Sequence, residues 1–174
     1  NTGGVRPFSP IRSTQQGNSP YEILIKAKDF ALSADFESNS SGDAKRYNTR
    51  GLFVDEQGSV TVEVSETINL KTGEFPIFAD SGNITIRGFK ELKAVTTGRT
   101  ETAVVEDASS GQGTLIQGGS ISIVRESEEA HSIVMTAHSQ DEGHIDIEGS
   151  DSVTIGSPNR EKEFAVQGFS KADR

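Results

Sequence analysis

Short segments of the chain place apolar residues at every second position. Ile23 and Ile25 occupy alternate positions, and Phe30, Leu32 and Ala34 do the same a few residues later. A period of two is typical of β-strands that bury one face. We therefore predict two short strands after residue 21.

A five-residue pattern, Gly-x-[Val/Ile]-x-[Val/Ile], occurs four times in the middle of the chain. The copies are GSVTV at 58–62, GNITI at 82–86, GSISI at 119–123 and GHIDI at 143–147. Their glycines are separated by 24, 37 and 24 residues, so two intervals are equal and an insertion would explain the third. Recurrence at this spacing indicates a structural repeat.

Further apolar clusters follow the opening strand of the repeats. A second cluster comprises Ile68/Leu70, Leu92/Ala94 and Val153/Ile155, and a third comprises Phe75/Ile77/Phe78, Val104/Val105 and Phe164/Val166. We therefore predict that each repeat forms three short strands separated by turns.

Such short strands cannot bury an apolar face alone and need a neighbouring repeat on each side. We predict an all-β fold, a parallel β-helix (β-solenoid) with three short strands per coil. Like residues would stack about 4.8 Å apart, with Val60, Ile84, Ile121 and Ile145 in one inward row. An antiparallel sandwich or barrel also uses this alternation and stays open as the alternative.

The chain divides into two parts by composition. Residues 1–20 hold three of the five prolines and lack either period, and residues 1–50 are predicted to be a lead-in that caps the first coil. Residues 51–174 hold the repeats, with the segment 97–118 long enough to project as an excursion.

Composition and charge exclude several classes of protein. The chain lacks cysteine, which excludes disulfide scaffolds and thiol nucleophiles. Only 32% of its residues are hydrophobic, and the narrow core of a β-solenoid would account for this low fraction. Apolar runs of about four residues are far too short for a membrane-spanning helix. The net charge is -9, and residues 101–152 carry one arginine against eleven acidic residues. We therefore expect neither nucleic-acid binding nor direct membrane insertion.

Catalytic and metal-binding motifs are sparse. Asp80-Ser81-Gly82 is similar to the nucleophile motif of chymotrypsin-like proteases but lacks its preceding glycine, and it reads as a turn. His144, Asp146 and Glu148 share one strand face, where oxygen and imidazole ligands could hold a cation, but neighbours on one face stand nearly 7 Å apart. We expect no enzyme activity, no cofactor and no metal, with these three residues as the metal candidate.

The repeats, such as GNITIRGFKELKAV and GHIDIEGSDSVTIGS, resemble the passenger domains of bacterial autotransporters and the related filamentous-haemagglutinin-like surface proteins. The resemblance covers about residues 51–170. It implies a right-handed parallel β-helix that is exported across an outer membrane and displayed at the bacterial cell surface or released. The C-terminal β-barrel of that family is missing, so the chain is expected to be a fragment.

These observations predict an extracellular, non-catalytic adhesin or self-association module. Its expected partners are a host glycan, a matrix protein or a second copy of the chain. The predicted contact residues lie in the excursion: Arg99, Glu101, Glu106 and Asp107. Two alternatives remain, a polysaccharide-processing enzyme or phage tail-spike fragment on the same kind of scaffold, and a structural stalk segment.

Overall fold

The computed structural model is built from β-strands, with no helix in the residues that it describes. These residues are 11–13, 21–34, 50–55, 58–80, 82–97, 103–108, 113–126, 134–138, 143–156 and 166–169. No helix that could span a membrane occurs in these ranges.

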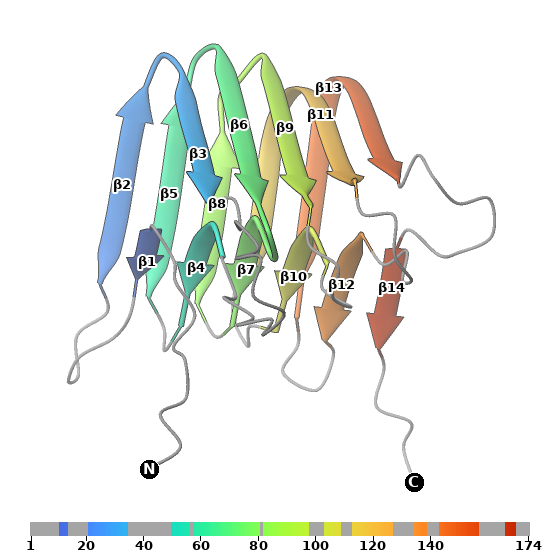
Figure 1. Ribbon diagram of the computed structural model, residues 1–174. Coiled ribbons are helices and arrows are strands. Elements are labelled where there is room, and N and C mark those ends of the chain that lie inside the picture. Colours follow the sequence, from blue (N-terminus) through green and yellow to red (C-terminus); the bar gives the residue numbers. More distant parts are fainter. Residues whose placement is uncertain are drawn as a thin grey trace, which may run out of the picture.

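One sheet contains six short strands (Figure 1). In spatial order they are β1 (Ile11–Ser13), β4 (Leu52–Val54), β7 (Ile77–Ala79), β10 (Val105–Asp107), β12 (Met135–His138) and β14 (Val166–Phe169). Every neighbouring pair is parallel, with Ile77 opposite Leu52 on one side and Val105 on the other. Ile77, Val105 and Val166, members of the third apolar cluster of the repeats, therefore lie in this sheet.

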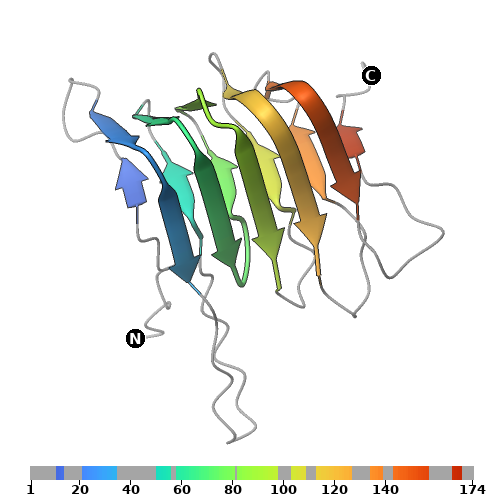
Figure 2. The same cartoon turned by 90° about the horizontal axis from the view of Figure 1, so that it is seen from above.

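The second sheet is bent. We call the parts of the sheet on either side of the bend its first face and its second face. The first face contains β2 (Glu22–Ala27), β5 (Ser59–Val64) and β8 (Asn83–Arg87). The second face contains β3 (Phe30–Ala34), β6 (Thr67–Thr72) and β9 (Glu91–Thr96). Two long strands, β11 (Thr114–Arg125) and β13 (Ile145–Gly156), run through both faces and join them. Figures 1 and 2 show each strand of the first face continuing over the bend into a strand of the second.

All strand pairs are parallel, and the paired strands come from successive repeats. Val60 lies opposite Ile84, 24 residues later, and Ile68 lies opposite Leu92 at the same separation. The prediction of an all-β chain with parallel sheets is confirmed. Parallel pairing also excludes the antiparallel sandwich or barrel for these strands.

The predicted inward row is wrong at one member. Thr114, and not Ile121, lies between Ile84 and Ile145, while Ile121 lies on the second face between Leu92 and Val153. The pattern Gly-x-Ile-x-Ile is local and fits a strand on either face, so it cannot specify which strands pair. The first-face strand of this repeat instead begins after Gly113.

The core is a thin layer of aliphatic side chains between the two sheets. Val60, Val62, Ile84 and Ile86 are fully buried on the first face, and Leu92 and Ile123 are fully buried on the second. Their polar neighbours in sequence are more exposed, as the alternation predicts. Most strands contribute no more than three apolar residues, which accounts for the low hydrophobic fraction.

Parts of the predicted cap and excursion lie within the sheets. Residues 22–27 pair with residues 59–64, and residues 30–34 pair with residues 68–72. In the range 97–118, β10 belongs to the six-stranded sheet and residues 114–118 belong to β11, while 98–102 and 109–112 lie outside the described residues. The range is therefore not one continuous projection, because its apolar residues stack on the neighbouring repeats.

Candidate functional site

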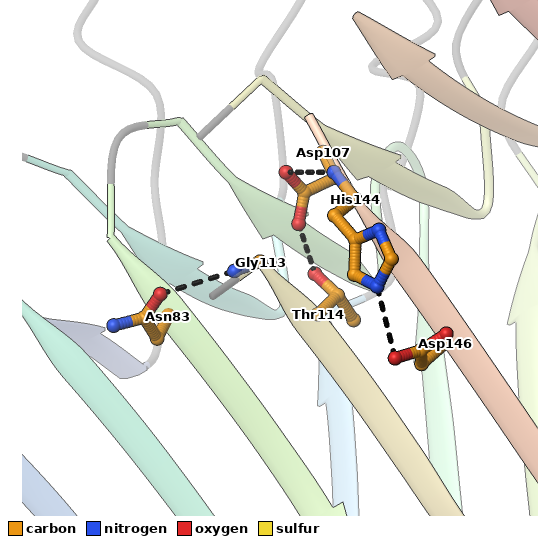
Figure 3. Close-up of polar contacts among 6 residues, drawn as sticks. All are labelled: Asn83, Asp107, Gly113, Thr114, His144 and Asp146. Atoms are coloured by element: carbon orange, nitrogen blue, oxygen red, sulfur yellow. Dashed lines mark hydrogen bonds and ion pairs between the residues drawn. The ribbon is translucent and has the colours of Figure 1, made fainter. Parts of the chain in front are cut away.

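A polar corner joins the two sheets where β10 ends and β11 begins (Figure 3). Gly113 takes a φ of 72° there, and a Cβ at this position would collide with the backbone of His144. The side-chain oxygen of Asn83, at the start of β8, accepts a hydrogen bond of 3.1 Å from the Gly113 N–H. Glycine is required here because the left-handed conformation and the close backbone approach both exclude a side chain.

Asp107 is the buried centre of this corner. Its side chain is fully buried, and its two carboxylate oxygens accept hydrogen bonds from the Thr114 hydroxyl at 2.7 Å and from the His144 N–H at 3.3 Å. Asp107, one of the predicted contact residues, therefore bonds within the protein. Its carboxylate connects the end of β10 with the first residue of β11 and with the segment before β13.

The metal candidates do lie along one outward face, but they bond to different partners. His144 Nε2 lies 2.9 Å from Asp146 Oδ2, whereas Glu148 Oε2 accepts a 2.6 Å hydrogen bond from Gln117 Nε2. The His144 and Asp146 side chains are both more than half exposed. In the part of the chain that the structure describes, no three His, Cys, Asp or Glu residues are grouped closely enough to hold a metal ion.

Of the other predicted contact residues, Glu106 is the one that the structure describes. Arg99 and Glu101 lie outside the described residues, as does Ser81. Glu106 precedes Asp107 in β10 and is half-buried, and its side chain points to the opposite face of the sheet. Its register partner Phe78 belongs to an aromatic cluster on that face.

This cluster consists of three phenylalanines with Arg50 above them, and Arg12 also lies over Phe53. The Phe53 and Phe78 rings stack with centroids 5.3 Å apart, and the Phe75 ring lies 5.0 Å from Phe78. The Arg50 guanidinium lies 4.4 Å from the Phe53 centroid and 4.5 Å from that of Phe78. Burial lowers the pKa of Arg50 from its ordinary value, partly offset by Asp80 and Glu106. The cluster is a packed cation–π site rather than an open binding surface.

An open groove of about 960 Å³ follows the bend between the two faces of the larger sheet. Four glycines line it, Gly88, Gly118, Gly119 and Gly149. A Cβ at Gly118 would lie 2.5 Å from the Phe89 ring, and one at Gly119 would collide with the Lys90 backbone oxygen. Close packing at the bend thus excludes side chains at Gly118 and Gly119.

One wall of the groove is a row of outward side chains in register across five strands. Lys26, Glu63, Arg87, Gln117 and Glu148 occupy consecutive strands of the first face. Lys26 Nζ lies 2.9 Å from Glu63 Oε2, and Arg87 pairs with the other oxygen of the same carboxylate. We call this row the charged ladder. At about 4.8 Å per strand, it extends over about 19 Å.

Glu63 is the electrostatic centre of the ladder. Hydrogen bonds from Lys26 and then from Arg87 hold the pKa of Glu63 below its ordinary value of 4.5. Across the bend, Lys90 also pairs with Glu66 at 2.8 Å. The groove therefore offers donors, acceptors and both signs of charge along a straight line.

The sequence contained a signal for this ladder that the motif analysis missed. Glu63 and Arg87 are 24 residues apart, and so are Glu66 and Lys90. This separation equals the interval between Gly58 and Gly82. Opposite charges separated by one repeat should meet across neighbouring strands, so searching for such pairs would have located the site.

Comparison with known proteins gives no relative: no family model, no curated protein and no solved structure matches this chain.

Proposed function

We propose that the chain is a right-handed parallel β-helix with three strands per coil. Two observations support this architecture. Strands of the six-stranded sheet alternate along the chain with strands of the bent sheet, and paired strands come from successive repeats. Crossovers between parallel strands of one sheet are right-handed in about 98% of cases. An elongated scaffold of this kind repeats its surface side chains in straight rows.

On this scaffold the chain would act as a non-catalytic adhesin of an extracellular bacterial surface protein. The observation that supports the proposal is the groove with its charged ladder. A linear glycan displays hydroxyl and carboxylate groups at regular intervals, and a straight row of fixed donors and acceptors suits such a ligand. Lys26, Arg87 and Lys90 each keep more than half of their side-chain surface exposed, so they can donate further hydrogen bonds.

Binding would depend on several weak contacts along the ladder. Each exposed charged group contributes little alone because water and salt screen it. A ligand that spans several strands adds such contacts without reordering the protein, since internal pairs already hold the ladder side chains. We therefore expect affinity to rise with ligand length and to fall with ionic strength.

The test is retention of the whole chain on immobilised glycans and matrix proteins, with two matched variants. Arg87→Ser removes a cation from the groove, whereas Lys93→Ser removes an exposed cation from β9 that does not line it. We expect Arg87→Ser to weaken retention about tenfold, and Lys93→Ser to behave as wild type. Equal effects of both variants, or no retention by any surface, would refute the adhesin proposal at this groove.

A polysaccharide-processing activity is the second candidate. It is favoured by two carboxylates, Glu148 and Asp151, that line the same groove. Paired carboxylates perform general acid and base catalysis in glycosidases. Incubation with neutral and acidic polysaccharides, followed by an assay for new reducing ends, tests it. Cleavage that Glu148→Gln abolishes would establish the activity and replace the adhesin proposal.

A further inference from the structure

The last layer of the bent sheet has an open apolar face. Strand β13 pairs with β11 on one side, and its other edge pairs with no described strand. Its inward positions are less buried than those of every layer inside it: Val153 is 45% exposed, whereas its neighbours Ile121 and Leu92 in the same row are 1% and 0% exposed. Ile145, Ile147 and Ile155 are partly exposed in the same way.

The first layer has a corresponding face at the opposite end of the stack. Strands β2 and β3 pair with β5 and β6, and their other edges pair with no described strand. Ile23, Ile25 and Phe30 occupy the inward rows and are only partly buried, although Leu32 is 6% exposed. An unpaired edge beside a half-exposed apolar row can accept a further strand.

The register of the sheet makes the two faces complementary. Following one row through the strands connects Ile23 at one end with Ile145 at the other, and a second row connects Ile25 with Ile147. On the second face, one row connects Phe30 with Val153. A second copy added in the same register would therefore place aliphatic or aromatic side chains against aliphatic ones in these three rows.

The charged ladder is complementary across the same junction. The ladder begins with Lys26 at the first strand and ends with Glu148 at the last. In the added copy, Lys26 would lie beside Glu148 of the preceding copy. The alternation of cation and anion seen between Lys26, Glu63 and Arg87 would thus continue through the contact. A same-end contact would pair β2 with β2 or β13 with β13, and it would not place Lys26 beside Glu148.

We infer that this chain associates head to tail with a second copy of itself, β2 and β3 of one copy pairing with β13 of the next. The inference rests on the β-helix architecture proposed above and not on ligand binding in the groove. Because this contact joins two different surfaces, its repetition produces an open linear assembly rather than a closed dimer. The backbone edges would supply hydrogen bonds, and the apolar rows would supply burial.

The experiment compares two pairs of adjacent substitutions. Val153→Asp places a charge in the proposed contact, and Thr154→Asp places the same charge on the outward face of the same strand. Ile23→Asp and Leu24→Asp form the matched pair at the other end, where Leu24 is 52% exposed. Mass is measured by sedimentation across a concentration series, and far-UV circular dichroism checks folding. Val153→Ser serves as a milder second variant.

We expect wild type and the two control variants to form oligomers in steps of 18.6 kDa. Val153→Asp and Ile23→Asp should each remain monomeric, or should need an about tenfold higher concentration to associate, because burying a charge in the contact is unfavourable. An equimolar mixture of these two should form a species of two copies, since each retains one intact, complementary end.

Three results would overturn the inference. A wild type that stays monomeric at every concentration would mean that another part of the chain covers these ends. Dimerisation of Val153→Asp by itself would indicate a same-end contact. Equal loss of association in the control variants would show that the inward residues are not specifically required. Glycan retention by a monomeric variant would separate the outcome from that of the adhesin proposal, because Val153 and Ile23, which these variants change, do not line the groove.

Discussion

Thr114 donates a 2.7 Å hydrogen bond to the buried carboxylate of Asp107, and through it the last residue of β10 is tied to the first residue of β11. The two residues belong to different sheets. Their hydrogen bond therefore fixes how the six-stranded sheet meets the first face of the bent sheet. It also explains why a threonine occupies an inward row that is aliphatic in the neighbouring repeats.

Removal of this donor should destabilise the protein. Thr114→Val keeps the shape of the side chain but removes a hydrogen bond to a buried carboxylate, which costs about 1–3 kcal/mol of unfolding free energy. Thr114→Ser, which retains the hydroxyl, is the control. Urea denaturation of the three proteins measures the difference. If serine costs as much as valine, the hydrogen bond is not the source of the stability.

The glycine at the bend should tolerate no side chain. Gly119→Ala would force a Cβ against the Lys90 backbone oxygen, and such overpacking costs about 1–3 kcal/mol. Gly156→Ala is the matched control, because no atom lies within 4 Å of a Cβ there. Thermal melting should show a lower midpoint for the first variant and no decrease for the second. Equal melting curves would show that the bend relaxes without cost.

Acid should weaken the charged ladder. Because the folded state holds the pKa of Glu63 below its ordinary value of 4.5, the ladder's contribution to stability is present above that pH and is lost as pH falls through the lower folded pKa. Glu63→Gln should flatten the melting temperature profile below about pH 4.5. Glu91→Gln, an exposed carboxylate on β9, is the control. A profile that Glu63→Gln leaves unchanged would contradict the assignment.

Substitutions of Arg50, above the aromatic cluster, should distinguish the contribution of its packing from that of its charge. Arg50→Ala removes the side chain that covers Phe53 and Phe78 and should cost about 1–2 kcal/mol through lost cation–π contact and packing. Arg50→Met keeps most of that packing and avoids the desolvation that lowers the Arg50 pKa. We therefore expect the methionine variant to retain most of the wild-type stability in chemical denaturation. A methionine variant as unstable as alanine would show that the charge itself is required.

Local alternation was sufficient to predict most strands and their buried faces. The alternating residues near Ile23 and Phe30 lie in β2 and β3, and the patterns after Gly58, Gly82 and Gly143 lie in β5, β8 and β13. Side chains in a strand alternate between faces, so a period of two reveals burial without knowledge of the neighbours. The equal intervals of 24 residues additionally gave the correct register between Val60 and Ile84.

The tertiary structure decided what pairs over long separations. Ile121 repeats the local pattern of Ile84, yet only the assembled sheet shows that Thr114 takes that place and that Asp107 is buried beneath it. The groove is equally non-local, since its ladder brings together residues from five strands. Sequence periodicity indicates which face of a strand is apolar. Which strands stack on one another depends on turn lengths and on close backbone contacts at Gly113 and Gly119, and these contacts exist only in the folded chain.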